Sequence, residues 1–332
     1  MHNPKIWLSE AVTRIPQSNI PEQQRYNHTT NPTTKKKHSR GDEWDQINLT
    51  ELLKCPHKKL YEGQSRFQNI HVLEAKEIRM FLDGQLQFSS LDERIYHEAF
   101  VHIPMSLTKS HERILILGGG DGLALREVLK YPDVKHVDLV DIDPEILRIA
   151  REVPEIVSLN EQAFYDKRVT AYAEDARTFL QTDKRKYDLI IVDFPDPTDP
   201  VLASLYSLEM FQSLGDCLTS NGMIVCQSNS PEDTPIVYWS IGLTMEKAGF
   251  YTQGYHTIIP SFGDWGFQLG SKTPLATQLR EINVPYRTLP PNLGKLFHFK
   301  SQLLSYRAEA IVNRESNPQL DKIFQEEIIK VY

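Results

Sequence analysis

A glycine-rich turn between an apolar run and a helix-like segment is the first place where residue types and spacing suggest chemistry. Gly118, Gly120 and Gly122 follow Ile114–Leu117 in the pattern GxGxG. Glycines there let the backbone bend sharply and let a ligand approach the main chain. The dinucleotide pattern GxGxxG fails, because Leu123 stands at its third glycine position. The spacing is typical of proteins that bind sulfonium nucleosides, a class that includes methyltransferases; a plain tight turn is the alternative.

Acidic residues stand in this turn and at the ends of the predicted strands that follow. Asp121, inside the turn, would repel a pyrophosphate. Asp141 ends the second strand 21 residues after Gly120, and an acidic residue at about that distance accepts hydrogen bonds from ribose hydroxyls. Asp175 follows the third strand and could accept from an adenine amino group, or it could be the N-cap of a helix. Together these residues favour a nucleoside ligand without a pyrophosphate.

Two further carboxylates, Asp193 and Asp196, lie three residues apart after the fourth predicted strand. This is the carboxyl end of a central strand, where ligands bind in open α/β sheets. Three prolines stiffen the segment 193–200. A purely structural loop would not need two acids that project into the crevice, so we expect both to act on a ligand.

An alternation of strands and helices is predicted to position these residues. Continuous apolar runs are typical of buried parallel strands. A helix is expected at Leu123–Leu129, and Pro144 favours the first turn of another. Residues 251–259 and 265–269 are expected to close the sheet as an antiparallel pair. The apolar runs occur at 114–117, 137–140, 169–172, 189–192 and 223–226.

A smaller β unit is predicted before this alternation. Residues 68–74, 78–82 and 85–88 are strand-like, and Asp83-Gly84 is a strong hairpin signal. A helix is expected over 91–107. The predicted fold class is therefore α/β, with a doubly wound, mostly parallel sheet behind a small N-terminal antiparallel β domain.

Composition excludes several classes of protein. The 332 residues carry 37 Lys and Arg against 44 Asp and Glu, a net charge of −7, which disfavours a general nucleic-acid binder and suits a cationic substrate. Three cysteines form no CxxC pair and no cluster with histidine, so neither a disulfide framework nor a metal site is expected. The sequence has no apolar stretch of membrane-spanning length and no secretory signal, so we expect a cytoplasmic protein that binds no membrane.

The ordered motifs resemble those of the spermidine synthase (polyamine aminopropyltransferase) family, and in particular a divergent bacterial branch of it. The resemblance covers about residues 50–272 and includes a DE-x-x-YHE segment at Asp92–Glu98 that binds the acceptor in the family. Later motifs match at Cys226-Gln227-Ser228, Pro260-Ser261 and Trp265-Gly266-Phe267. The core of the match is ILILGGGDGLALREVLKYP (114–132), DLVDID (138–143), AEDA (173–176) and DFPDP (193–197).

The resemblance implies a Rossmann-like catalytic domain of the class I methyltransferase type and a role for each matching residue. Asp193 corresponds to the catalytic proton acceptor and Asp196 to its partner in a gating loop. Tyr96 is expected to be a third catalytic residue. Asp121 corresponds to the carboxylate that holds the donor's aminopropyl ammonium. The donor's methylthioadenosine part is expected at Gln68, Gly118, Gly120, Asp141, Asp175, Ala176 and Pro200. The substrate side is expected to include Tyr96, His97, Asp121, Asp193, Asp196, Gln227, Asp264 and Trp265.

The implied reaction transfers the aminopropyl group of decarboxylated S-adenosylmethionine to a di- or polyamine, such as putrescine, with release of methylthioadenosine. No metal takes part, and relatives form homodimers or homotetramers. Two alternatives stay open. One is a methyltransferase that uses S-adenosylmethionine, although Asp121 would repel the carboxylate of that donor. The other is a catalytically silent protein that binds an amine or a nucleoside. Release of methylthioadenosine separates the three.

Three departures from the family pattern concern the acceptor. Phe194-Pro195 replaces two hydroxyl residues in the DFPDP loop. Ile259 stands where relatives have a tyrosine, and Phe262 is inserted before Gly263. Because isoleucine cannot hydrogen-bond an amine, we expect Asp264, or else Tyr206, to take over this contact.

Four segments are predicted along the chain. Residues 1–45 form a polar extension whose basic run at 35–40 is a solvated arm or a contact for nucleic acid or lipid. Residues 46–107 form the small β-hairpin domain with its linking helix, 108–275 the catalytic domain, and 276–332 a helical extension.

Overall fold

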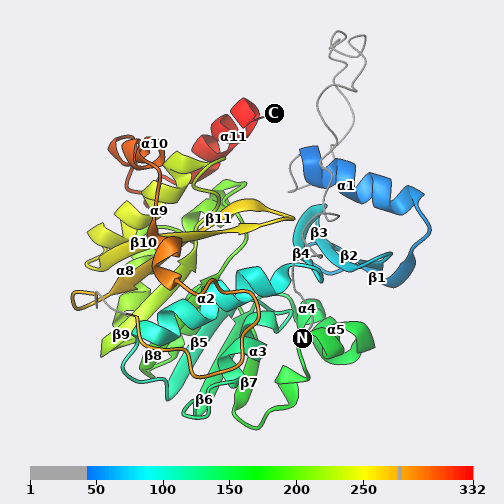
Figure 1. The fold of residues 1–332 in the computed structure, drawn as a ribbon, viewed down its shortest axis with the longest axis horizontal. Helices are drawn as coiled ribbons and strands as arrows, with labels where there is room; N and C mark the ends of the chain where they lie inside the picture. The colour runs from blue at the N-terminus through cyan, green and yellow to red at the C-terminus, as the bar shows by residue number, and fades with distance from the viewer. Residues whose placement is uncertain (1–42, 276–278, 332) are drawn as a thin grey trace. The chain divides into compact units, whose positions relative to one another are not determined.

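A seven-stranded sheet forms the centre of the catalytic part of the protein in the computed structural model, which describes residues 43–275 and 279–331 (Figure 1). Its strand order is β10-β11-β9-β8-β5-β6-β7, with five parallel strands and an antiparallel pair, β10 and β11, at one edge. The strands are β5 (Arg113–Gly118), β6 (His136–Asp141), β7 (Val169–Ala173), β8 (Tyr187–Asp193), β9 (Leu218–Gln227), β10 (Tyr251–Ile259) and β11 (Gly263–Ser271). The predicted doubly wound sheet is confirmed.

Strand β5 shows why the apolar runs form a buried sheet. Successive side chains of a strand point to opposite faces, and Ile114 and Ile116 enter one core while Leu115 and Leu117 enter another. The first core is covered by α2 (Glu93–Leu107) and α3 (Leu123–Leu129). The second is covered by α6 (Ala176–Thr182), α8 (Leu208–Cys217), α9 (Pro235–Lys247) and α11 (Leu320–Val331).

Helices α4 (Pro144–Glu152), α5 (Pro154–Leu159) and α7 (Pro200–Ser204) each begin with a proline at the first turn. The fixed φ of proline suits this position, where no intrahelical hydrogen bond is lost. Pro144 therefore opens a helix as predicted. Asp143 caps α4 by accepting from the backbone N–H of Glu145, and Asp199 caps α7 by accepting from those of Val201 and Leu202.

The small β unit is an antiparallel sheet in the order β1-β2-β3-β4. Asp83 and Gly84 both have positive φ, 49° and 84°, as a type I′ hairpin turn requires. The predicted hairpin is confirmed. The apolar pattern did not predict β1 as a strand, because its positions are exposed or half-buried and form no apolar run. The strands are β1 (Lys58–Gln64), β2 (Asn69–Glu74), β3 (Ile78–Leu82) and β4 (Gln85–Ser89), preceded by helix α1 (Glu43–Lys54).

The C-terminal segment was expected to be helical, and helices cover only parts of it. Residues 279–292 contain no helix, and 3₁₀ turns, α10 (Ser301–Ser305) and α11 account for the helical part. Tertiary contacts hold the irregular part instead: the buried carboxylate of Glu98 on α2 accepts from the backbone N–H groups of Arg287 and Thr288. The domain boundaries stay predictions.

Residues 1–42, with the basic run at 35–40, lie outside the described part of the chain. None of the described helices has the length and apolar character that crossing a membrane requires.

Candidate active site

The glycine-rich turn and Asp193 lie in direct contact at the carboxyl ends of two neighbouring strands. Gly118 ends β5 and pairs in register with Asp193, which ends β8. Gly118 has a φ of +80°, and a Cβ atom there would lie 2.1 Å from the carbonyl oxygen of Asp193. A Cβ on Gly119 would lie 3.1 Å from Oδ2 of Asp193. These glycines are therefore required for the turn to pass close to the carboxylate.

Asp141 joins the same turn from β6. Its Oδ2 accepts from the backbone N–H of Gly120 at 3.0 Å, and its Oδ1 accepts from the N–H of Asp143 at 2.8 Å. Burial raises the pKa of Asp141 to about 6, although both N–H groups favour the charged form. A carboxylate oxygen has a second lone pair, so Asp141 can still accept from a ribose hydroxyl.

Asp121 and His97 bring opposite charges together beside the turn. Oδ1 of Asp121 accepts from the N–H of Leu123 at 2.8 Å. Burial raises the pKa of Asp121, and the nearby His97 works against that rise. His97 is 4% exposed, and its Nδ1 lies 2.7 Å from the backbone oxygen of Glu93.

Tyr96 makes the shortest contact to Asp193. Its hydroxyl donates to Oδ1 of Asp193 at 2.6 Å. The ring packs between Phe100 and Phe267, each with its ring centroid 5.3 Å away. Burial raises the pKa of Asp193 to about 6, against the lowering effects of His97 and of the Tyr96 hydrogen bond. Helix α2 thus presents Tyr96 and His97 to the end of β8.

Asp196 is fixed from two sides. Its Oδ2 accepts from Gln85 on β4 at 2.8 Å, and its Oδ1 accepts from Asn229 at 2.9 Å. Gln85 belongs to the small sheet, so this hydrogen bond joins the small sheet to the loop after β8. No sequence signal distinguished Gln85 or Asn229 from other amides; only the folded contacts identify them.

Gln227 supports the same loop, and its Nε2 also lies 3.4 Å from Oδ1 of Asp196. Its Nε2 donates to the carbonyl oxygen of Phe194 at 2.6 Å and to the hydroxyl of Tyr206 at 2.7 Å. The Tyr206 hydroxyl donates in turn to the carbonyls of Phe194 and Pro195. Phe194 is buried in the second core against Tyr206. Tyr206 is therefore committed to the loop backbone and does not replace the missing acceptor tyrosine.

Direct contacts connect only some of the residues that are expected around the methylthioadenosine part of the donor. Gln68 donates to Oδ2 of Asp143 at 2.9 Å. Asp175 caps α6 by accepting from the N–H groups of Arg177 and Thr178, so the N-cap interpretation is confirmed. Its neighbour Ala176 is buried, whereas Pro200 is exposed at the first turn of α7.

Asp264 is not brought to this site. Along β11, Trp265 and Phe267 point to the face that α2 covers, and Asp264 alternates to the opposite face. There it accepts from Nδ1 of His256 at 2.6 Å, and the His256 ring stacks on Phe299. Asp264 is therefore paired with His256, and its contact with the acceptor amine stays a prediction.

The acceptor loop closes with apolar side chains. Ile259 is fully buried in the first core, and Phe262 packs on Trp265 with ring centroids 5.3 Å apart. Asp92 holds the loop by accepting from the N–H and the hydroxyl of Ser261 at 2.7 and 2.9 Å. Nε1 of Trp265 is buried and has no hydrogen-bond partner in the described part of the chain. A buried N–H group of this kind normally donates a hydrogen bond to a ligand or an ordered water.

Comparison with known proteins agrees with this arrangement. A family model described as the spermine/spermidine synthase domain matches residues 93–280. A polyamine aminopropyltransferase 2 of Bacillus cereus is 50% identical over 291 residues, which are 86% of this chain and 80% of that protein. The chain belongs to the spermine/spermidine synthase family. A polyamine aminopropyltransferase 2 of Ralstonia nicotianae is 39% identical over 268 residues, which are 79% of this chain and 52% of that protein.

Solved structures of the family share the fold. A spermidine synthase in complex with the transition-state analogue AdoDATO has a TM-score of 0.70 and 25% identity, covering 76% of this chain and 89% of that one. The spermidine synthase of Thermotoga maritima has a TM-score of 0.67 at 25% identity, covering 76% and 88% of the two chains. The predicted family and the predicted fold class are confirmed.

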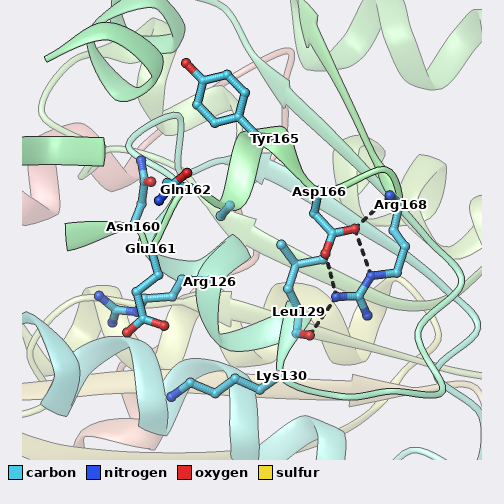
Figure 2. A pocket seen from close by; sticks show the side chains of 10 residues that line it. Arg126, Leu129, Lys130, Asn160, Glu161, Gln162, Tyr165, Asp166 and Arg168 are labelled. Atoms are coloured by element: carbon cyan, nitrogen blue, oxygen red, sulfur yellow. Dashed lines mark hydrogen bonds and ion pairs between the residues drawn. The ribbon is translucent and has the colours of Figure 1, made fainter. Parts of the chain in front are cut away.

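A pocket of about 400 Å³ lies away from this family site, between α3 and residues 160–168 (Figure 2). Its charged side chains already have partners: Arg168 pairs with Asp166, Glu161 with Arg94, and Lys130 with Glu127. These charges are therefore paired with one another or with neighbouring side chains.

Within the described residues, no group of three or more His, Cys, Asp and Glu side chains is arranged to hold a metal ion.

Proposed function

We propose that the protein is a polyamine aminopropyltransferase that moves the aminopropyl group of decarboxylated S-adenosylmethionine to a di- or polyamine. The observation that carries the proposal is the meeting of Asp121, Asp141 and Asp193 around one glycine turn, where burial raises the pKa of each. Buried carboxylates with raised pKa values are typical of functional sites. A cationic ligand that enters would restore their charged forms.

The reaction is a displacement at the carbon next to the donor's sulfonium sulfur. A neutral amine nitrogen forms the new C–N bond, the C–S bond breaks, and its electron pair neutralises the sulfur in methylthioadenosine. The amine then loses a proton. For an amine with a pKa of about 10.4, the neutral form at pH 7 costs about 5 kcal/mol. Orientation and electrostatic stabilisation supply most of the rate.

Asp193 is the proposed proton acceptor. Even with its pKa raised to about 6, the carboxylate is a weaker base than the amine, so it takes the proton during or after attack. The Tyr96 hydroxyl at 2.6 Å fixes one of its oxygens and leaves the other, Oδ2, for the acceptor amine. Asp196 then orients the remaining part of the acceptor from the loop that Gln85 steadies.

Asp121 is the proposed partner of the donor's ammonium, and Asp141 that of its ribose. Gln68, Asp175, Ala176 and Pro200 are proposed to surround the methylthioadenosine part. Trp265 is proposed to line the acceptor side, where its free indole N–H can donate. The cytoplasmic location expected from the sequence and the homodimer or homotetramer implied by the family resemblance are part of the proposal.

The deciding experiment measures product release from decarboxylated and ordinary S-adenosylmethionine with a panel of putrescine, cadaverine, agmatine, spermidine and norspermidine. Methylthioadenosine that appears only with an amine supports the proposal. S-adenosylhomocysteine would identify a methyltransferase, and the absence of both products would identify a silent binding protein.

A second test uses Asp121→Asn and calorimetric titration. The variant should weaken binding of the decarboxylated donor far more than binding of methylthioadenosine, because only the donor carries the ammonium. Equal losses for both ligands would limit Asp121 to a role in shaping the turn through its bond to Leu123.

A further inference from the structure

A buried ion pair lies behind Tyr96 and His97, and the proposed reaction does not use it directly. Glu93 and Arg126 are each 2% exposed. Arg126 binds Glu93 in bidentate fashion, with Nη1 to Oε1 at 2.9 Å and Nη2 to Oε2 at 2.8 Å. Such forked pairs fix both side chains strongly. Arg126 is itself fixed by Glu127 and by the carbonyl of Leu159.

Glu93 determines which nitrogen of His97 carries a proton. Nδ1 of His97 lies 2.7 Å from the carbonyl oxygen of Glu93 and 3.0 Å from Oε2 of the same residue. A carbonyl oxygen and a carboxylate oxygen accept hydrogen bonds only. Nδ1 must therefore be the N–H, whether the ring is neutral or charged. Within the described residues, Nε2 makes no hydrogen bond, so it is the nitrogen that titrates.

The charges around His97 come from four elements. Glu93 and Tyr96 lie on α2, Arg126 on α3, Asp121 in the glycine turn and Asp193 at the end of β8. Burial lowers the pKa of His97, but the Glu93 hydrogen bond and charge outweigh it, and Asp121 adds to the rise. Arg126 opposes this rise only weakly, because Glu93 lies between them.

We propose that Glu93, clamped by Arg126, is a positioning residue that locks His97 in the Nδ1–H form and turns Nε2 toward the ammonium-binding part of the crevice. The inference rests on the proposed function for its substrate, a cationic amine. Asp121 and Asp193 are the site carboxylates whose charges act on His97. When a substrate ammonium binds there, neutral Nε2 becomes a hydrogen-bond acceptor for it.

The first test needs no substrate and uses the free wild-type protein. Nitrogen NMR of the labelled imidazoles, with His97→Gln to assign the signal, reports the protonation of each ring nitrogen across a pH titration. We expect Nδ1 to stay protonated throughout and Nε2 alone to titrate, with a midpoint above the ordinary histidine value. A wild-type ring that is protonated at Nε2 in its neutral form would overturn the proposal.

The second test compares Glu93→Gln with Glu98→Gln on the same helix. Both replace a buried carboxylate by its amide, but Glu98 binds the N–H groups of Arg287 and Thr288 instead of His97. Glu93→Gln should lower the His97 midpoint by about one pH unit, as expected for the loss of an adjacent opposite charge. Glu98→Gln should leave the midpoint unchanged. Equal shifts in both variants would contradict a specific role for Glu93.

The third readout is kinetic. Glu93→Gln should lower kcat/KM for the decarboxylated donor about 10- to 100-fold, the effect of one hydrogen bond to a charged group, and change methylthioadenosine affinity less than about threefold. Arg126→Lys keeps the positive charge but loses the bidentate contact with Glu93, so it should lower kcat/KM by a smaller factor. An unchanged kcat/KM in folded Glu93→Gln would overturn the proposal. If the wild type released no methylthioadenosine, only the proposed function would fail, because the NMR result is independent of turnover.

Discussion

Asp193 lies between a tyrosine hydroxyl and an imidazole, and this environment decides how its carboxylate can act. The hydroxyl of Tyr96 donates to Oδ1 of Asp193. In the glycine turn, Gly118 packs against the carbonyl oxygen of Asp193 and Gly119 packs against its Oδ2. The side chain is therefore held in one orientation before any substrate arrives. Such preorganisation is the main source of electrostatic catalysis in enzymes.

We predict that Asp193→Asn keeps the fold and lowers turnover at least 100-fold, because proton acceptors typically contribute about 10²–10⁴-fold. Tyr96→Phe, which keeps the ring between Phe100 and Phe267 but frees Oδ1, should lower turnover by a smaller factor. Steady-state assays of methylthioadenosine release measure both. If Asp193→Asn retains more than a tenth of wild-type turnover, Asp193 is not the proton acceptor.

The raised pKa of Asp193 also predicts a pH-dependent effect on stability. A carboxyl that titrates near 6 when folded and near 3.8 when unfolded holds its proton longer in the folded state. Stability therefore falls as pH rises from about 4 through 6, and the full penalty is present above pH 6. Two pKa units correspond to at most about 3 kcal/mol.

Asp193→Asn should therefore raise the free energy of unfolding at pH 7.5 by up to about 3 kcal/mol, and by little at pH 4. Urea denaturation at the two pH values measures this. Asp199→Asn is the control, because asparagine caps a helix as well as aspartate does. A gain that is equal at both pH values would show that burial of the charge is not the cause.

At the scale of elements, a side chain of the small sheet contacts the loop after β8. Gln85 on β4 donates to Asp196, and the amides of Asn229 and Gln227 donate to the same carboxylate. The position of Asp196 thus depends on a residue more than a hundred positions earlier in the chain.

Gln85→Ala is predicted to raise KM for the amine acceptor several-fold while affinity for methylthioadenosine stays unchanged. The reason is that Asp196 loses the hydrogen bond from Gln85, while those from Asn229 and Gln227 still hold it. Gln87→Ala is the matched control, since Gln87 lies on the same strand and donates to the Gln85 carbonyl rather than to Asp196. Equal changes in both variants would refute the specific link.

The elements and the site were predictable from sequence to different degrees. Apolar runs predicted β5, β6, β8 and β9 because the central residues of these strands are buried on both faces, whereas the edge strand β7 is only half-buried. Asp83-Gly84 predicted the hairpin because its φ values suit few other residues. Strand β1 gave no such signal. The face of Asp264 could not be predicted, because a shift of one position along a strand exchanges the two faces of the sheet.

At the scale of the whole molecule, the C-terminal segment is joined to the catalytic domain by buried polar anchors. Asn313 donates to the carbonyl of Ala203 and accepts from the N–H of Gln319. Glu98 binds the backbone at Arg287 and Thr288. These contacts make an irregular segment part of the core, which helix periodicity alone could not reveal.

Glu327 on α11 makes a further anchor. Its two oxygens accept from the N–H groups of Ile236 and Val237 at 2.9 and 3.1 Å, in the first turn of α9. A carboxylate favours the positive end of a helix. Helix α9 follows the loop that contains Asn229, and the Thr234 hydroxyl at its start bonds to Asn229 Oδ1. Through the start of α9, Glu327 therefore indirectly supports Asn229, which donates a hydrogen bond to Asp196.

We predict that Glu327→Ala lowers the free energy of unfolding by about 1–3 kcal/mol, because two buried N–H groups lose their acceptor. Glu326→Ala, at the exposed neighbouring position, should change it by less than about 0.5 kcal/mol. Urea denaturation measures both. At 25 °C, where the variant is still folded, kcat should stay within about twofold of wild type, because Gln85 continues to hold Asp196. A large loss of kcat without loss of stability would mean that α11 acts on the chemistry rather than on the fold.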